Sequence, residues 1–198
     1  MYYLNGRGSL SRLTTVSFDD GTYTGTLGIA RTSVLLTSTS KDASKVTLSG
    51  DVTLSYANTA ACQYLTFAGG LTIQDSIRCS VEHCTVTGPR KIAVALARNV
   101  SAYINNVSAY INDVTGTRTG TAGDVFNIAN TANVSIKDCS ATGYSTTSGA
   151  AFTIVHCNYV AFTGTNTAST SAYAIYMVNS VIEFSSSGTI NYNNIGSV

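Results

Sequence analysis

Three stretches of the chain align without a gap: Arg78-Cys-Ser-Val-Glu-His-Cys-Thr-Val-Thr-Gly88, Asn106-Val-Ser-Ala-Tyr-Ile-Asn-Asp-Val-Thr-Gly116 and Asn133-Val-Ser-Ile-Lys-Asp-Cys-Ser-Ala-Thr-Gly143. Residues 51–61 and 159–169 extend the series on either side. The leading apolar residues of the five stretches are separated by 27, 28, 27 and 26 residues: Val52, Cys79, Val107, Val134 and Val160. A period of this length is typical of a solenoid, in which each repeat stacks on the next.

A second column of alternating apolar residues lies some six to eight residues upstream of the first. Its members are Val46 and Leu48, Leu71 and Ile73, Phe126 and Ile128, Phe152 and Ile154, and Tyr173 and Ile175. Two short strands in each repeat, with side chains alternating between two faces, predict an all-β single-stranded parallel β-helix. We expect about six or seven turns of roughly 21–28 residues each. A β-sandwich of short strands is the alternative, but sandwich strands do not repeat their sequence at this interval.

The composition fits one folded domain that spans residues 1–198. Thr and Ser number 29 and 24, yet 44% of the residues are hydrophobic, so the chain has enough apolar side chains for a core. We divide it into a lead-in segment (1–15), first turns (16–50), aligned repeats (51–169) and last turns (170–198).

Charge and hydropathy exclude several classes of partner. The net charge is +1 with 11% charged residues, which argues against a nucleic-acid partner. The longest apolar run, residues 92–97, is far shorter than the ~18 residues of a membrane span. The first residues lack the apolar core of a secretory signal, so we expect no signal peptide and no membrane insertion.

The five cysteines predict neither a disulfide framework nor a metal site. Their number is odd, no CxxC is present, and no Cys/His cluster has zinc spacing. We expect five free thiols that act as small core residues, with no metal and no cofactor.

One segment resembles a known superfamily. It comprises Val16-Ser-Phe-Asp-Asp-Gly-Thr-Tyr-Thr-Gly25, Leu27-Gly-Ile29, Val34-Leu-Leu36 and Lys45-Val-Thr-Leu-Ser-Gly50. This pattern is similar to the first turn of the right-handed β-helix superfamily, which includes pectate lyases, pectin esterases and bacteriophage tailspikes. The resemblance implies a right-handed coil. The resemblance does not extend to the catalytic residues of the lyases or esterases, because the ten acidic residues of this chain are scattered.

The catalytic residues are unknown, and only Asp113 and Asp138 form a pair worth testing. In the aligned repeats they lie on adjacent turns, two residues out of phase. Turn spacings of ~4.8 and ~9.6 Å bracket the carboxylate separations of retaining and inverting glycosidases. The alternative is that both are solvated turn residues. His83 and His156 lie in different columns with no identifiable acid at triad spacing, so we interpret them as polar surface or corner residues.

A candidate binding edge follows the closing glycines of the repeats. Stacking would place Arg90, Lys91, Arg118 and Tyr144 along one side of the rod. Cations beside an aromatic ring suit an anionic or neutral saccharide. The alternative is an ordinary soluble loop edge.

These features favour a structural and host-surface recognition protein that resembles a bacteriophage tailspike or tail fibre. Such a protein would belong to the virion tail, bind bacterial surface polysaccharide and form a homotrimer, since a solenoid has open ends that partner chains can cover. One alternative is a polysaccharide-degrading enzyme, a lyase or glycosidase, on the same fold. The few carboxylates and the absence of Trp argue against it, so we lean against an enzyme. A bacterial adhesin passenger fragment is a weaker alternative, because free thiols are uncommon in secreted proteins.

Overall fold

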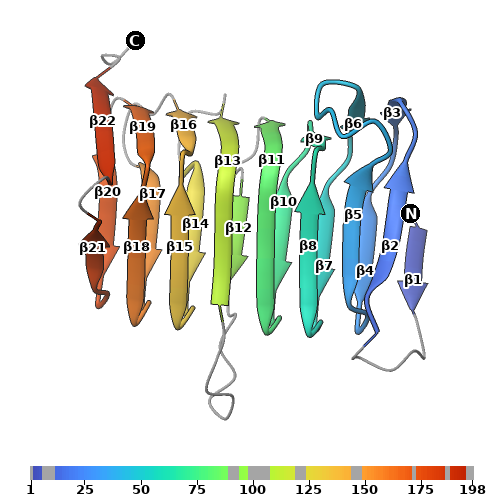
Figure 1. The fold of residues 1–198 in the computed structure, drawn as a ribbon, viewed down its shortest axis with the longest axis horizontal. Helices are drawn as coiled ribbons and strands as arrows, with labels where there is room; N and C mark the ends of the chain where they lie inside the picture. Colours follow the sequence, from blue (N-terminus) through green and yellow to red (C-terminus); the bar gives the residue numbers. More distant parts are fainter. Residues whose placement is uncertain are drawn as a thin grey trace.

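The computed structural model describes residues 2–5, 12–88, 94–97, 108–118, 124–143, 149–170, 173–185 and 188–194. Every regular element in these ranges is a β-strand, and every pairing between strands is parallel. The strands form two long sheets that run the length of an elongated molecule (Figure 1). The described part of the chain contains no helix that is long and apolar enough to cross a membrane.

The first sheet has eight strands, which lie side by side in chain order. They are β1 (Tyr2–Asn5), β4 (Leu27–Ala30), β7 (Val52–Ser55), β10 (Leu71–Gln74), β12 (Val94–Ala97), β14 (Phe126–Ala129), β17 (Ala150–Val155) and β20 (Tyr173–Val178).

The second sheet has fourteen strands and two parts separated by a bend. The main part contains β2 (Thr14–Phe18), β5 (Val34–Ser38), β8 (Thr59–Gln63), β11 (Arg78–Gly88), β13 (Ser108–Arg118), β15 (Asn133–Lys137), β18 (Tyr159–Thr163) and β21 (Ile182–Phe184). The part beyond the bend contains β3 (Gly21–Tyr23), β6 (Val46–Leu48), β9 (Thr66–Phe67), β16 (Ser140–Gly143), β19 (Thr165–Thr170) and β22 (Thr189–Asn194). The long strands β11 and β13 run through both parts.

The chain passes through the two sheets in alternation, and we call one pass through the first sheet and then the second a rung. Each strand pairs with the strand at the same place in the next rung. This arrangement is compatible with a β-helix solenoid. It excludes the sandwich alternative, whose sheets are antiparallel.

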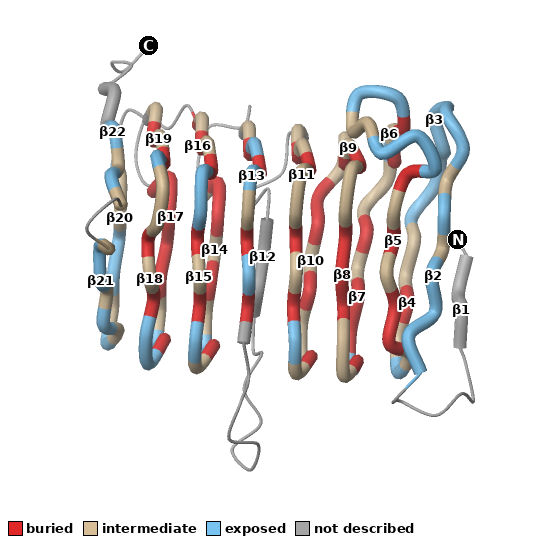
Figure 2. The backbone as a smooth tube through the Cα atoms, viewed as in Figure 1, coloured by how far each residue is buried: buried red, intermediate tan, exposed pale blue. Residues whose placement is uncertain are grey.

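Buried residues recur along the strands of both sheets in successive rungs (Figure 2), and the buried hydrophobic residues form one core cluster. The inward positions predicted for four residues are confirmed, since all are at most 2% exposed: Val134, Ile136, Phe152 and Ile154. The prediction for the cysteines is also confirmed, because all five are free and buried.

The predicted register of one repeat is wrong by two residues. Cys79 pairs with Ala109, and Val134 pairs with the same Ala109, where the alignment placed Val107. A shift of two residues keeps every side chain on its own face, so the apolar pattern cannot detect it.

The structure also reassigns strands around residue 50. Val52 lies in the first sheet beside Leu71, and Ala60 occupies the position next to Cys79 that we predicted for Val52. The pair Val46 and Leu48 lies beyond the bend, in β6, and not beside Leu71 and Ile73. In the last rung, Ile175 lies beside Phe152, where the alignment placed Tyr173. These stretches all alternate apolar and polar residues, so composition alone does not say which sheet each one joins.

Candidate functional site

The bend in the second sheet brings side chains from successive rungs into one column. Gln63, Glu82, Asn112 and Lys137 are in register across four strands, so the residues that follow them also stack: Tyr64, His83, Asp113 and Asp138. All four stacked residues have a left-handed backbone, with φ between 51 and 57°. That conformation is uncommon outside glycine, and Asp and His adopt it more readily than most residues. We call these four residues the corner column.

Three members of the corner column contact one another. The rings of Tyr64 and His83 are stacked, with centroids 4.9 Å apart and planes inclined by 7°. The Nδ1 atom of His83 lies 2.8 Å from Oδ2 of Asp113. An ionised carboxylate can only accept hydrogen bonds, so Nδ1 of His83 carries the proton in this contact. Nε2 of His83 remains for another partner.

A polar groove opens beside this column. It has a volume of about 580 Å³ and lies between the loop around residue 42 and the strands after the bend. Its lining residues are Ser40, Lys41, Asp42, Ala43, Tyr64, His83, Cys84, Thr85, Asp113 and Thr115. The groove therefore combines an aromatic stack, carboxylates, an amine and hydroxyl groups.

Hydrogen bonds fix the loop that forms one wall of the groove. Asp42 Oδ1 accepts from the backbone N of Ser44 at 2.9 Å and from its Oγ at 2.7 Å. Both bonds favour the ionised carboxylate and lower the pKa of Asp42. Thr66 Oγ1 donates to the carbonyl oxygen of Ala43 at 2.7 Å, which ties the loop to β9. The wall is thus held in place before any ligand binds.

A row of hydroxyl side chains lies two residues after the corner column. Thr66, Thr85, Thr115, Ser140 and Thr167 are in register on successive rungs. Thr85 and Thr115 form part of the groove, and Thr167 Oγ1 lies 2.9 Å from Ser140 Oγ. The row continues the polar surface beyond the groove along the rod.

The two predicted carboxylates have different surroundings. They are in phase on adjacent rungs, not two residues out of phase as the alignment placed them. Asp138 Oδ1 accepts from the backbone N of Thr165 at 2.8 Å, and its Oδ2 lies 4.0 Å from Lys137 Nζ. A Cβ at Gly164, whose φ is +64°, would lie 2.1 Å from Asp138 Oδ1. Asp138 therefore supports a turn, whereas Asp113 faces the groove.

The predicted saccharide edge falls largely outside the described residues. Arg90, Lys91 and Tyr144 lie outside them, as does the side chain of Arg118. The backbone of Arg118 pairs with Gly88 and Gly143. The closing position of that rung is thus Arg118 and not Gly116, which follows from the two-residue shift described above.

Three parts of the site do not follow from the sequence. His83 has an acidic partner, Asp113, which the misplaced register concealed. Tyr64 lies between the aligned stretches 51–61 and 78–88, and the loop around residue 42 precedes both. Neither carries a motif, so nothing in the sequence singled them out. His156, by contrast, is exposed as expected. It lies between β17 of the first sheet and β18 of the second, and its Nδ1 atom is 3.5 Å from Asn179 Nδ2.

Within the described residues, no group of three or more His, Cys, Asp or Glu side chains could hold a metal ion. The fold and the groove together define an all-β protein with a polar, partly aromatic lateral site. Comparisons with protein-family models, with curated proteins and with solved structures gave no match to the chain.

Proposed function

We propose that this protein is a right-handed parallel β-helix that recognises a bacterial surface polysaccharide, in the manner of a bacteriophage tailspike or tail fibre. The resemblance of residues 16–50 and the rung-by-rung parallel pairing support this fold. The setting we propose is the virion tail, where the protein meets the polysaccharide on the outside of the host cell.

The groove is the observation that carries the proposal. A saccharide offers many hydroxyl groups and flat C–H faces, and the groove supplies partners for both. The carboxylates of Asp113 and Asp42 line the groove and can accept hydrogen bonds from the hydroxyl groups of the saccharide. Hydrogen bonds to an ionised carboxylate are stronger than those between neutral groups. Tyr64 and His83 form a rigid aromatic pair with large contact area and few rotatable bonds. Such a site suits a hydroxyl-rich ligand better than an apolar one.

A second candidate is the polysaccharide-degrading enzyme. The His83 to Asp113 hydrogen bond favours it, because an imidazole held at Nδ1 can accept a proton at Nε2. The turn contacts of Asp138 favour recognition over cleavage, since they occupy the second carboxylate of the predicted glycosidase pair. An adhesin passenger remains the weaker candidate because all five thiols are free.

The test is a binding and cleavage assay with a panel of purified capsular polysaccharides and O-antigens. We expect Tyr64→Ala to weaken binding of the recognised polysaccharide about tenfold, since it removes an aromatic contact face. Tyr56→Ala is the matched control, because Tyr56 has a φ of 55° against 57° for Tyr64 but does not line the groove. Lack of binding to every panel member, or equal losses in both variants, would refute the proposal. New reducing ends or unsaturated products that disappear in His83→Gln would establish the enzyme instead.

Homotrimer formation is part of the same proposal. Tyr110 and Tyr159 are 37% and 38% exposed, and such rings are common in protein interfaces. Light scattering should give a mass near three times the 20.6 kDa of one chain. A monomer at every concentration would remove the trimer but leave the groove in place.

A further inference from the structure

The turn at the corner column is not the same in every rung. Successive rungs turn there through one left-handed residue each: Tyr64, His83, Asp113, Asp138 and Gly164. The rung before Tyr64 turns through residues 39–45, which join β5 to β6. We call residues 39–45 the corner loop, and Figure 1 shows it beside β6 and β9. Because the corner loop comes directly before Tyr64 in the column, it stands across one end of the groove.

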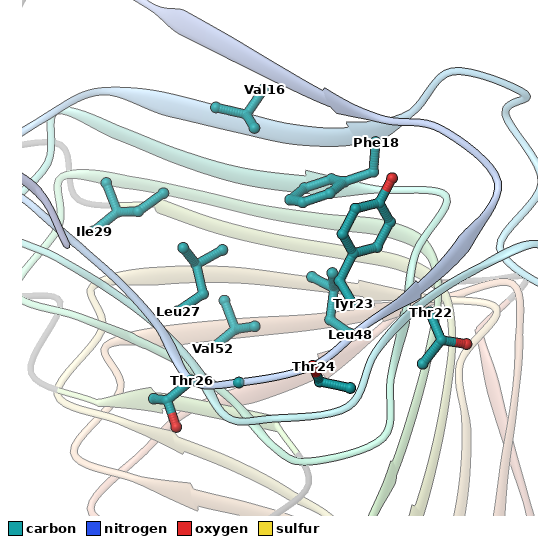
Figure 3. Close-up of a pocket in the computed structure, with 11 residues that line it drawn as sticks. Val16, Phe18, Thr22, Tyr23, Thr24, Thr26, Leu27, Ile29, Leu48 and Val52 are labelled. Carbon is teal, nitrogen blue, oxygen red and sulfur yellow. The ribbon is translucent and has the colours of Figure 1, made fainter. Parts of the chain in front are cut away.

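The rung before the corner loop holds the loop in place. Thr39 Oγ1 donates to Asp19 Oδ1 at 3.1 Å, and the Tyr23 hydroxyl donates to the carbonyl oxygen of Asp19 at 3.0 Å. The Tyr23 ring also meets the Phe18 ring at its edge, with centroids 5.0 Å apart (Figure 3). Together with the bond from Thr66, these contacts fix the loop from both neighbouring rungs. The groove is therefore closed by a firm wall at this end.

On the side of the later rungs, the groove adjoins two rows of hydroxyl side chains. The first row contains Thr85 and Thr115, which line the groove, and continues through Ser140 and Thr167. The second row lies two residues further along the same strands and therefore on the same outward face: Thr87, Thr117, Thr142 and Ser169. We call these two rows the hydroxyl array. All its side chains are at least partly exposed, and none of them is ionisable.

The charges of the groove indicate which saccharides fit it. Asp42 and Asp113 line it together with one amine, that of Lys41. A polysaccharide with a carboxylate in each repeat would bring its own negative charge against both aspartates, and like charges in contact cost binding free energy. The hydroxyl array adds no charge of its own. An uncharged polysaccharide therefore suits the surface better than an acidic one.

The apolar cavity in Figure 3 is a poorer site for such a ligand. It has a volume of about 440 Å³ and lies between β2, β3 and β4. Val16, Phe18, Leu27 and Ile29 surround it. Walls of this kind offer few partners to sugar hydroxyls, and a hydroxyl buried without a hydrogen bond costs free energy. The groove is therefore the better site.

We propose that the groove holds one end of an uncharged, linear polysaccharide, and that the chain runs from there along the rod over the hydroxyl array. This inference rests on the proposed function. Neighbouring rungs are about 4.8 Å apart, close to the length of one sugar in an extended chain, so each rung meets one sugar. The end sugar lies against Tyr64 and His83, and the corner loop stops the chain from continuing past them.

Recognition of a chain end is tested with linear polysaccharides of the panel, cut by partial acid hydrolysis into fractions of known length. In isothermal titration calorimetry, each chain should occupy one groove whatever its length. A number of occupied grooves that grows with chain length would overturn the inference, because it would show binding along the interior of the chain. Affinity should rise from the disaccharide to about the tetrasaccharide, one sugar for each rung of the array, and then level off.

A double variant tests the contribution of the hydroxyl array. Ser140→Ala/Thr167→Val removes two hydroxyl partners, so it should weaken tetrasaccharide binding about tenfold and leave disaccharide binding unchanged. The control is Ser135→Ala/Thr72→Val, which makes the same two changes at outward strand positions away from the groove and should bind like the wild type.

Two outcomes separate this inference from the proposed function. Disaccharide binding with no gain for longer fragments, or unchanged tetrasaccharide binding in Ser140→Ala/Thr167→Val, would overturn the inference and leave polysaccharide recognition standing. Lack of binding to every polysaccharide and fragment would overturn both.

Discussion

Phe152 gives the sharpest test of how aromatic stacking stabilises the core. Its side chain is 0% exposed and contacts two other rings. The Phe126 ring is stacked on it at 5.1 Å with planes at 18°, and the Phe162 ring meets it edge to face at 5.4 Å. Replacement by Leu keeps most of the apolar volume but removes both ring pairs. At roughly 0.5–1.5 kcal/mol per pair, the loss is about 1–3 kcal/mol. Imperfect repacking around the new side chain adds about 1 kcal/mol.

Phe67→Leu is the matched control for this prediction. Phe67 is also 0% exposed, but in the described part of the chain no ring contacts it. The free energy of unfolding should therefore fall in Phe67→Leu only by the repacking cost of about 1 kcal/mol. Urea denaturation followed by circular dichroism gives the free energy of unfolding of each variant. Equal losses for Phe152→Leu and Phe67→Leu would show that the ring pairs contribute nothing beyond burial.

Three further predictions concern the thiols, a glycine and a tyrosine. Burial raises the pKa of the cysteine thiols, to about 12 for Cys139, so a thiol reagent at neutral pH should label none in the folded protein and five after unfolding; fewer than five after unfolding would contradict this. A Cβ at Gly50 would lie 2.2 Å from the carbonyl oxygen of Gly25, so Gly50→Ala should lower the free energy of unfolding by on the order of 2 kcal/mol, and unchanged stability would refute the close packing of these rungs. The hydrogen bond to Glu183 raises the pKa of Tyr159, so the bond is intact below the ordinary tyrosine pKa and is lost as the pH rises through the raised value; Glu183→Gln should lower that pKa in an ultraviolet titration, and no change would refute the bond.

Much of the fold could be predicted because the repeat fixes which side chains face inward. Alternation places Val134, Ile136, Phe152 and Ile154 in the core whatever the exact pairing. It does not fix the pairing itself, because a shift by two residues leaves the pattern unchanged. The error at Ala109 is of this kind, and only the positions of neighbouring backbones resolve it.

The candidate site was harder to predict because it depends on that register. Asp113 meets His83 only when the strand shifts by two residues, and the same shift puts Asp113 in phase with Asp138. The left-handed backbone of the corner column could not be predicted from the residue types either, since Asp also occurs in ordinary turns. Tyr64 enters the site through the same backbone conformation, without any sequence motif.

The parallel pairing of successive rungs has a mechanical consequence. Hydrogen bonds between neighbouring strands run across the strands, and here that direction is the long axis of the rod (Figure 1). Tension applied between the two ends is therefore borne in series by every layer of hydrogen bonds, so the rod separates first at its weakest layer. Compression is carried by all the packed side chain columns at once, including the Phe126, Phe152 and Phe162 rings. Pulling and pushing along the axis therefore load different interactions, the hydrogen bonds between rungs in one case and the packed side chains in the other.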